Sequence, residues 1–483
     1  MPLPPTTVPP GDQTPATGVL ACSATDRTVS ADRGGRDDAC PGALRLHPAH
    51  DGALARVRLP GGLLTGRQAR TLAAVAEELG DGRLDLTSRG NVQLRGLAEG
   101  CGAPLAEQLR SVGLLPSDAH DRVRNIVASP LSGLDGAGHT DTSMWARELD
   151  TLLCTAGSGE LRALSGLSGR FLFALDDGRG DVAALGADVT LIATPGAGAV
   201  LSVGAAGSGA LRIAAEDAPR AAALAAVEFL TRAEESGIRA WRVRELPAQH
   251  AVTAAGLAAR LAGAGIGLEP DTGTGGGGAG RDTAPPGPRT EPRLPSPGPV
   301  PGPHGRHAVS VAVPLGRMTA AQWRLLAALA SRDGADELRV TPWRGVVLPG
   351  FTPGAARLAA DELAGAGLVT DPGSPWLGIG ACTGLPGCAK SLADVRADAG
   401  RTAARTTTGG ERRTVPLPVY FSGCERRCGH PGGRWVDALA TGTGYRITVR
   451  GTSVPSGTPG DPDGTDVTAE QVADAVAAAR GTR

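Results

Sequence analysis

The stretch VRLPGGLLTGRQARTLAAVAEELGDGRLDLTSRGNVQLRG, residues 57–96, occurs a second time as VAVPLGRMTAAQWRLLAALASRDGADELRVTPWRGVVLPG, residues 311–350. The two stretches align without a gap at a constant offset of 254, and 16 of the 40 positions are identical. The identities include Pro, Thr and Gln residues, which the Ala- and Leu-rich composition does not explain. The sequence therefore predicts an internally duplicated protein.

Each copy has the pattern of a strand, a helix and a second strand. In the first copy, residues 54–59 alternate between apolar and polar, which is typical of a half-buried strand. Thr65 and Gln68 form a capping box, in which each side chain satisfies a free backbone N–H at the start of a helix, and the second copy repeats both residues. Residues 84–94 supply the next strand. We therefore predict an α+β fold with pseudo-twofold symmetry.

The Gly/Pro-rich segment 271–303 divides the chain, because its 9 Gly and 9 Pro in 33 positions cannot bury enough apolar surface to order it. Two more helices are predicted outside the repeat, over 217–235 with a stop at Gly237, and from 468 to about 480. The predicted organisation is a disordered tail (1–38), an N-terminal part with the first copy of the repeat (39–270), a linker (271–303), and a C-terminal part with the second copy (304–483).

Charge and hydropathy exclude several classes of protein. The net charge of −1 and the pI of about 6.7 give no field that would recruit nucleic acid or an anionic membrane. No apolar run approaches the roughly 20 residues that span a bilayer. We expect a cytoplasmic protein, and a monomer is compatible with the sequence. In a reducing cytoplasm, clustered cysteines favour metal binding or catalysis over disulfides.

Four of the eight cysteines form two pairs with short spacings, Cys382-x5-Cys388 and Cys424-x3-Cys428. Both pairs lie in Gly-rich stretches, GACTGLPGC (380–388) and FSGCERRCGHP (421–431), where the backbone can approach a bulky group closely. Iron–sulphur clusters take four thiolates, so these residues predict one 4Fe-4S cluster. Structural zinc, whose usual spacing is C-x2-4-C, and unrelated buried or redox thiols stay open as alternatives.

The paired cysteines resemble the cluster signature of the sulfite and nitrite reductase superfamily, whose members are also internally duplicated. Further matching segments are RVRLPGG (56–62), LDLTSRGNVQLRG (84–96) and RVRNIVASP (122–130). The resemblance implies a sulfite/nitrite-reductase-like fold in which Cys382, Cys388, Cys424 and Cys428 hold the cluster.

By the same resemblance, Arg56, Arg58 and Arg89 face the carboxylates of a bound tetrapyrrole, and guanidinium groups suit that task because they pair bidentately with carboxylates. The superfamily places a K-x-K pair at the substrate oxyanion. Here Arg170 can replace the first lysine, with a catalytic role shared by Arg89, but Leu172 cannot replace the second. In the second copy, Ala and Trp stand where the first has Arg58 and Arg89.

Other segments resemble the precorrin-3B synthases: residues 39–42 (ACPG), residues 381–399, and Gly429-His430-Pro431 after the last cysteine. That resemblance implies oxygen-dependent hydroxylation of the tetrapyrrole precorrin-3A, with lactone formation, in cobalamin biosynthesis. It implies dioxygen as a second substrate, and ferredoxin or a separate NAD(P)H-dependent reductase as electron donor. Siroheme or an additional non-haem iron is compatible with it. The roles of Cys40 and His430 stay open.

Three functions are therefore compatible with the sequence. The first is the precorrin-3B synthase-like monooxygenase. The second is a siroheme-dependent sulfite or nitrite reductase. The third is a non-catalytic iron–sulphur electron-transfer or zinc-binding module.

Overall fold

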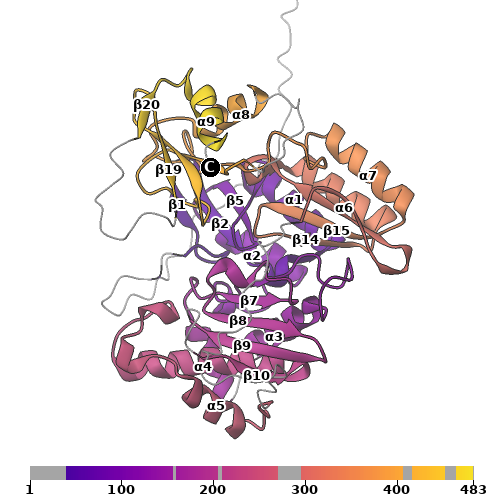
Figure 1. The fold of residues 1–483 in the computed structure, drawn as a ribbon, viewed down its shortest axis with the longest axis vertical. Coiled ribbons are helices and arrows are strands. Elements are labelled where there is room, and N and C mark those ends of the chain that lie inside the picture. Colours follow the sequence, from indigo (N-terminus) through magenta and orange to yellow (C-terminus); the bar gives the residue numbers. More distant parts are fainter. Residues whose placement is uncertain are drawn as a thin grey trace, which may run out of the picture.

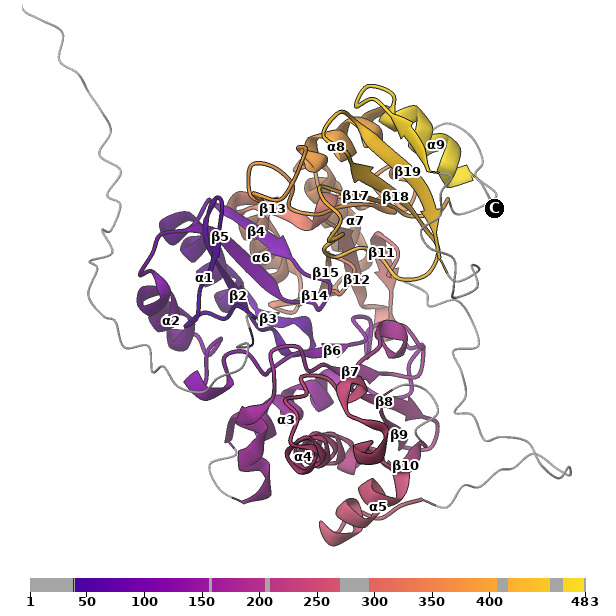
Figure 2. The ribbon, with the colours of Figure 1, turned by 90° about the vertical axis from the view of Figure 1, so that its left-hand side faces the viewer.

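The computed structural model describes residues 38, 40–155, 159–204, 209–269, 295–405, 416–451 and 464–481. Within these residues the strands form four five-stranded sheets. The repeated stretches build two of the sheets, and the segments that follow each of them build the other two (Figures 1 and 2). The predicted class, mixed helix and sheet with an internal duplication, is confirmed.

The two sheets of the repeat have matching strand orders. The first sheet has the order β1 (His47–Ala49), β2 (Gly52–Val57), β5 (Val92–Leu97), β4 (Arg83–Leu86), β13 (Arg317–Thr319). The second has the order β11 (Gly298–Pro301), β12 (His307–Ala312), β15 (Gly345–Phe351), β14 (Glu337–Val340), β3 (Leu63–Thr65). Their helices are α1 (Gly66–Leu79) and α2 (Gly102–Ser111) in the first copy, and α6 (Ala320–Asp333) and α7 (Pro353–Gly365) in the second.

Each sheet of the repeat takes its fifth strand from the other copy. Strand β13 pairs antiparallel with β4, with Met318 opposite Leu84, and β3 pairs antiparallel with β14, with Leu64 opposite Leu338. The two copies also share one hydrophobic core. The predicted division at the linker therefore separates the copies in sequence but not in space, because neither sheet is complete without the other copy.

Helices α1 and α6 pack against each other at the centre of the paired copies (Figure 2). Both predicted capping boxes are confirmed: the Thr65 hydroxyl accepts from the Gln68 N–H and Thr319 does the same with Gln322. Such a cap contributes typically ~1 kcal/mol to helix stability. The fully buried Trp323 donates its indole N–H to the carbonyl oxygen of Ala69 at 2.8 Å and so joins the two helices.

The duplication extends beyond the repeated stretch. The third sheet has the order β10 (Leu211–Ala214), β9 (Gly198–Val203), β8 (Val189–Thr194), β7 (Phe173–Asp176), β6 (Ile126–Ala128). The fourth has the order β16 (Ile379–Ala381), β17 (Val419–Ser422), β18 (Trp435–Ala440), β19 (Tyr445–Arg450), β20 (Thr465–Val467). In both sheets the first three strands in chain order are parallel and the last two antiparallel. The helices of these units are α3 (Thr142–Thr155), α4 (Ala218–Ser236), α5 (Ala254–Gly263), α8 (Val395–Arg405) and α9 (Val472–Gly481).

The single strand predicted over 84–94 is wrong, because the structure has a hairpin there. Strand β4 ends at Leu86 and β5 begins at Val92. Between them the Thr87 N–H donates to the carbonyl of Asn91 at 2.9 Å, and Gly90 has a φ of 65°, which favours glycine. Arg89 lies in this turn rather than on a strand.

Other boundaries also differ from the prediction. Helix α4 confirms the segment 217–235, with the left-handed Gly237 at its end, whereas α9 begins only at residue 472. Strand β11 lies inside the predicted linker, because residues 298–301 pair with β12. Asp38, predicted as the end of the tail, is buried and hydrogen-bonded. Residues 1–37 and 271–294 lie outside the described residues.

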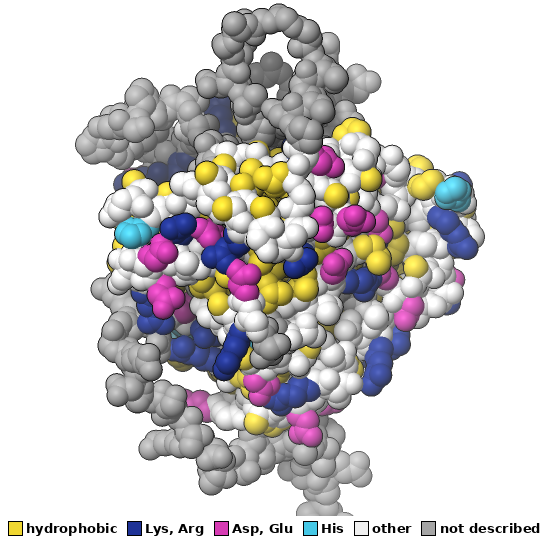
Figure 3. Space-filling model, turned by 90° about the horizontal axis from the view of Figure 1, so that it is seen from below, with side chains coloured by type: hydrophobic (Ala, Val, Ile, Leu, Met, Phe, Trp, Pro, Cys, Tyr) yellow, Lys and Arg dark blue, Asp and Glu magenta, His cyan; other side chains and the backbone are white. Residues whose placement is uncertain are grey.

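In the described part of the chain, no helix is both long and apolar enough to cross a membrane. The face in Figure 3 carries acidic and basic side chains interspersed with apolar ones. This mixture agrees with the near-zero net charge and offers no patch of a single sign on that face.

Candidate active site

Two of the four paired cysteines follow neighbouring parallel strands. Cys382 comes directly after β16, and Cys424 comes two residues after the end of β17. Because β16 and β17 pair in parallel, their carboxyl ends meet at one edge of the sheet. The Cys382 N–H donates to the carbonyl of Phe421 at 3.0 Å, and the Gly423 N–H donates to the Cys382 sulphur at 3.2 Å. The strands thus bring the two cysteine stretches together.

The other two cysteines lie in the loops that leave this edge. Burial raises the pKa of the Cys382 thiol, and the thiols of Cys388 and Cys424 raise it further, so these three groups lie within electrostatic reach. The Tyr420 hydroxyl donates to the Cys428 carbonyl at 2.6 Å. The pKa of Tyr420 is raised to about 12, first by burial and then by charges that include Cys382 and Cys428. All four cysteines therefore gather at one sheet edge.

The thiols and their N–H partners were compared with the needs of a single ion and of a cluster. Among the described residues, no three His, Cys, Asp or Glu side chains are close enough to hold one metal ion. Zinc would need four donors about 2.0–2.3 Å from one centre. A 4Fe-4S cluster spreads its thiolates over separate irons, and N–H groups directed at sulphur stabilise its negative charge. The Gly423 N–H at the Cys382 sulphur fits that requirement.

The first copy of the repeat holds the loop between Cys382 and Cys388 in place. Arg95, which is 4% exposed, donates to the carbonyl of Gly387 at 2.8 Å and pairs with Asp51 at 2.7 and 2.8 Å. The ring Nδ1 of His50 lies 2.9 Å from the Pro386 carbonyl oxygen. A Cβ on Gly387 would come within 2.7 Å of the Asp51 carboxylate, so the loop can approach this closely only with glycine there.

The loop around Cys428 is held by the second copy and by its own sheet. Arg427, at a φ of 44°, pairs with the buried Asp437 of β18. Arg344 donates to the Gly429 carbonyl at 3.1 Å. His430 stacks on Trp435 with ring centroids 5.2 Å apart, so its ring has a packing partner.

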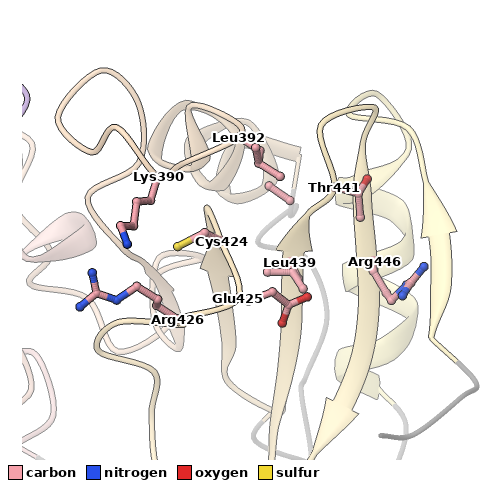
Figure 4. Close-up of a pocket in the computed structure, with 9 residues that line it drawn as sticks. Lys390, Leu392, Cys424, Glu425, Arg426, Leu439, Thr441 and Arg446 are labelled. Atoms are coloured by element: carbon pink, nitrogen blue, oxygen red, sulfur yellow. The ribbon is translucent and has the colours of Figure 1, made fainter.

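A pocket of about 480 Å³ opens beside Cys424 (Figure 4). It is lined by Lys390, Leu392, Cys424, Glu425, Arg426, Leu439, Ala440, Thr441 and Arg446. In Figure 4 the side chains of Lys390 and Arg426 extend to the side toward which the Cys424 sulphur points. Lys390 is also the only lysine of the sequence. The predicted cluster edge is thus flanked by two positive charges.

Three of the four predicted substrate-binding arginines come together on the first copy. Arg58 is 2% exposed and lies directly after β2, while Arg56 points its Nη2 at the Gln93 side chain of β5 at 3.0 Å. Arg89 donates from the hairpin turn to the carbonyl of Gly169 at 3.1 Å. Arg56 and Arg89 each lower the pKa of Arg58, so the three guanidinium groups form one cationic cluster, named the arginine pocket.

In this arginine pocket (Arg56, Arg58 and Arg89), the neighbouring anionic groups do not fully compensate the three positive charges. Burial, and then the charge of Arg56, lowers the pKa of Arg58 to about 9. Burial is also the main cause that lowers the pKa of Arg56 and of Arg89. Within the described residues, the buried Nε of Arg56 and Nη1 of Arg58 have no hydrogen-bond partner. Buried donors without partners are costly, so these atoms favour an anionic ligand in the pocket.

The fourth predicted arginine is placed differently. Arg170 is exposed, and its guanidinium stacks over the ring of Trp241 at 4.2 Å. Leu172 is buried in an apolar cluster that also contacts Trp343, the residue of the second copy that stands in place of Arg89. The second copy therefore fills the corresponding position with apolar side chains, as the sequence predicts.

Sequence reasoning missed one group near the pocket, Arg242, and left the role of another, Cys40, open. Arg242 affects the titration of Arg89 and pairs with the buried Asp188. Cys40 lies within electrostatic reach of all three pocket arginines. No motif marks Arg242, whereas the ACPG segment signals Cys40 without saying which group it contacts.

The repeated stretches match the family model "Nitrite/Sulfite reductase ferredoxin-like half domain" twice, over residues 47–112 and 300–366. Each half of the chain therefore carries a segment similar to this half domain.

Curated relatives match the chain over limited stretches. A ferredoxin–nitrite reductase of Synechococcus elongatus is 38% identical over 128 residues, which are 26% of this chain and 25% of that protein. A precorrin-3B synthase of Sinorhizobium is 33% identical over 114 residues, 24% of each chain. In these alignments the chain spans about a quarter of the length of the curated relatives.

A solved structure, that of the Mycobacterium tuberculosis NirA protein, matches over a greater length. Its TM-score is 0.68, over 87% of this chain and 79% of that one, with 20% sequence identity. At that identity the match establishes the fold. Along the chain, the three arginines of the pocket lie in the first half-domain match, whereas the four cysteines follow the second.

Proposed function

We propose that the chain is an iron–sulphur oxidoreductase that binds a tetrapyrrole in the arginine pocket and hydroxylates it with dioxygen, as a precorrin-3B synthase-like monooxygenase. The observation that carries the proposal is the pair of unpartnered, buried N–H groups of Arg56 and Arg58. A tetrapyrrole with acetate and propionate arms offers several carboxylates, each of which pairs well with a guanidinium.

The neighbourhood of the pocket favours carboxylate binding over reduction of a small oxyanion. A site for an oxyanion would gain from a second cation next to Arg170, but Leu172 is apolar and buried there. Arg170 itself stacks on Trp241 at the surface, where it can close over the rim of a large ligand. Arg56, Arg58 and Arg89 would then orient the ligand and exclude water from its carboxylate side.

The four cysteines would hold the 4Fe-4S cluster, which supplies single electrons when bound. Cys382, Cys388, Cys424 and Cys428 provide the thiolates, and the Gly423 N–H stabilises the negative charge at Cys382. Arg95 and His50 fix the first loop by its carbonyls, which keeps the thiolates oriented. Ferredoxin, from which the Synechococcus relative takes its name, or a separate NAD(P)H-dependent reductase would supply the electrons.

A siroheme-dependent nitrite or sulfite reductase is the second candidate. The ferredoxin–nitrite reductases that match the chain favour it, since the Synechococcus enzyme has the higher identity of the two relatives described above. In that case the arginine pocket would hold the siroheme carboxylates, and Cys428 would be the cluster ligand shared with the siroheme site. An additional non-haem iron would belong to the first candidate.

A visible spectrum of anaerobically purified protein separates the candidates. A broad iron–sulphur shoulder without sharp haem bands supports the monooxygenase, and strong haem bands support the reductase. A colourless protein without iron and labile sulphide would contradict both. Incubation of cluster-replete protein with precorrin-3A, oxygen and a reductant should then yield a hydroxylated lactone, and no oxygen-dependent product would refute the first candidate.

A further inference from the structure

The turn over residues 341–345 of the second copy repeats the turn over 87–91 of the first. In both turns the N–H of the opening threonine donates to the carbonyl four residues later, at 2.9 Å, and the fourth residue donates back to the threonine carbonyl at 3.1 Å. That fourth residue is left-handed in both copies, with a φ of 65° at Gly90 and 59° at Arg344. The two turns therefore share one backbone conformation and differ in the residue that adopts it.

The left-handed conformation is costly for an arginine. Glycine adopts it freely, whereas a residue with a Cβ is strained there, and the surrounding structure must offset the strain. The first copy avoids this cost at Gly90, and the second accepts it at Arg344. Residues held in such conformations cluster at functional sites. The contacts of the Arg344 side chain should therefore show what the second copy gains.

The guanidinium of Arg344 contacts the loop that carries the last predicted cluster ligand. Its Nη2 donates to the carbonyl of Gly429, the residue after Cys428, at 3.1 Å. A Cβ on Gly429 would lie 2.9 Å from the Tyr420 hydroxyl and 3.1 Å from Nη2 of Arg344. Tyr420 in turn donates to the Cys428 carbonyl at 2.6 Å, and its ring centroid lies 5.9 Å from the central guanidinium carbon. Arg344 and Tyr420 thus hold two successive carbonyls of this loop.

Burial contributes little to the position of the loop, because Cys428, Gly429 and His430 are all exposed. The hydrogen bonds to its carbonyls supply the constraint instead. The second copy also fixes the direction of the arginine. The stem of Arg344 packs over Gly316, where an added Cβ would come within 2.4 Å of Cδ. The guanidinium is therefore aimed at the loop by the fold of the second copy.

We propose that Arg344 is a positioning residue for the 4Fe-4S cluster, which fixes the loop of Cys428 and places one positive charge beside it. The contact is to a neutral carbonyl, so it does not neutralise the guanidinium. A positive charge near a cluster stabilises the reduced form, which is more negative by one electron. The inference rests on the proposed function only in that the four cysteines hold a cluster.

Three variants at this position separate the charge from the backbone conformation. Arg344→Gly relieves the left-handed conformation, Arg344→Gln removes the charge but keeps a long side chain, and Arg344→Lys keeps the charge. Asp336→Gly is the matched control, because Asp336 is also left-handed, at a φ of 53°, and aligns with Gly82 of the first copy. Its carboxylate accepts a hydrogen bond from Ser331 of α6.

A redox titration of the anaerobically purified protein, followed by electron paramagnetic resonance, measures the effect of the charge. At a fixed potential, the ratio of reduced to oxidised cluster should fall about threefold or more in Arg344→Gly and Arg344→Gln, because one nearby charge is lost and salt screens only part of its effect. Arg344→Lys and Asp336→Gly should keep the wild-type ratio. A merely structural role would not divide the variants by charge. Equal ratios in Arg344→Gln and the wild type would overturn the proposal.

Hydrogen–deuterium exchange on the same protein measures the position of the loop. The amides of residues 428–430 should exchange about tenfold faster in Arg344→Gly than in the wild type, because a hydrogen bond that anchors the loop is lost. The urea midpoint of this variant should not fall, since relief of the left-handed conformation offsets the lost bond. Exchange at the wild-type rate in Arg344→Gly would refute the positioning role.

Two outcomes separate this inference from the proposed function. A cluster-bearing protein that shows the charge effect but does not hydroxylate precorrin-3A keeps the inference and loses the proposed function. A protein that hydroxylates precorrin-3A, with the same cluster potential in Arg344→Gln and the wild type, loses the inference alone. Purified protein without iron and labile sulphide would overturn both.

Discussion

Replacing Arg95 with Met should both destabilise the protein and loosen the predicted cluster. Through three hydrogen bonds, Arg95 ties Asp51, on the hairpin before β2, to Gly387 in the loop between Cys382 and Cys388. Methionine keeps most of the buried volume but removes all three bonds. The variant therefore tests whether the first copy of the repeat positions the cysteine loop of the second.

The size of the effect depends on the two groups that lose their partner, the Asp51 carboxylate and the Gly387 carbonyl. Breaking a buried ion pair by removing one partner costs about 3–5 kcal/mol, because the other charge stays without compensation. The Asp51 side chain is 22% exposed, so water recovers part of this and the lower end applies. The unpaired Gly387 carbonyl is included in that figure. We expect a loss of about 3 kcal/mol, which is roughly a hundredfold in the folding equilibrium.

Urea unfolding followed by circular dichroism measures the loss, and chelator-induced bleaching of the visible absorbance measures how firmly the loop holds its metal. Arg110→Met is the matched control, because the Arg110–Asp118 pair lies in the same copy but is 42% and 61% exposed. Such a pair is worth about 0–1 kcal/mol. The reasoning is refuted if Arg95→Met bleaches no faster than Arg110→Met, even when it is less stable.

Three further predictions concern stability and its dependence on pH. Trp323→Ala should lower the free energy of unfolding in urea by about 3–5 kcal/mol, because it opens a cavity between α1 and α6 and removes the hydrogen bond to Ala69. A loss below about 1 kcal/mol would contradict the shared core. Burial raises the pKa of Asp181 to about 7, although the Ser129 hydroxyl donates a hydrogen bond to its carboxylate. The wild type therefore loses stability as pH rises from about 4 to 7, because the unfolded chain ionises at lower pH than the folded one. The free energy of unfolding of Asp181→Asn should rise by about 2–4 kcal/mol relative to that of the wild type between pH 5 and 8. A constant difference would refute it. Burial lowers the pKa of Arg58 to about 9, so above that pH the folded state binds fewer protons than the unfolded state. From about pH 9 upward, the free energy of unfolding of the wild type should therefore rise relative to that of Arg58→Met. Parallel plots of unfolding free energy against pH for the two proteins would contradict this.

The repeat, the capping boxes and the cysteine spacing were readable from the sequence because each depends on local chemistry. Thr65 and Gln68 satisfy N–H groups within one turn, so their pattern is complete in four residues. The hairpin over 83–97 was missed, because Leu84, Leu86, Val92 and Leu94 keep the spacing of one strand on both sides of the polar turn, in which Gly90 packs near the Val340 carbonyl. That contact comes from the other copy.

The same limit applies to the candidate site. The spacing of the cysteines predicts a shared centre, but the clamp by Arg95 joins residues 292 positions apart, and no local pattern reports it. Cys40 could be singled out by its motif, yet its neighbours Arg56, Arg58 and Arg89 reach it only through the pairing of β2 with β5 and the turn before β5. Contacts of this kind depend on the sheet, which the sequence predicts only in outline.

Exchange of strands between the copies explains how a duplicated chain can carry the arginine pocket in one copy and the paired cysteines in the other. The first copy keeps the arginine pocket, whereas the second has Trp343 in place of Arg89 and packs it against an apolar cluster of the first unit that includes Leu172. Cys382 and Cys424 follow β16 and β17 of the second unit and have no counterparts after β6 and β7, where Ser129 and Gly178 stand. Neither unit alone carries both the cationic pocket and the thiolates. Because β3 and β13 cross between the copies, separating the halves would break both sheets, and so the division of roles can persist only in an intact pair.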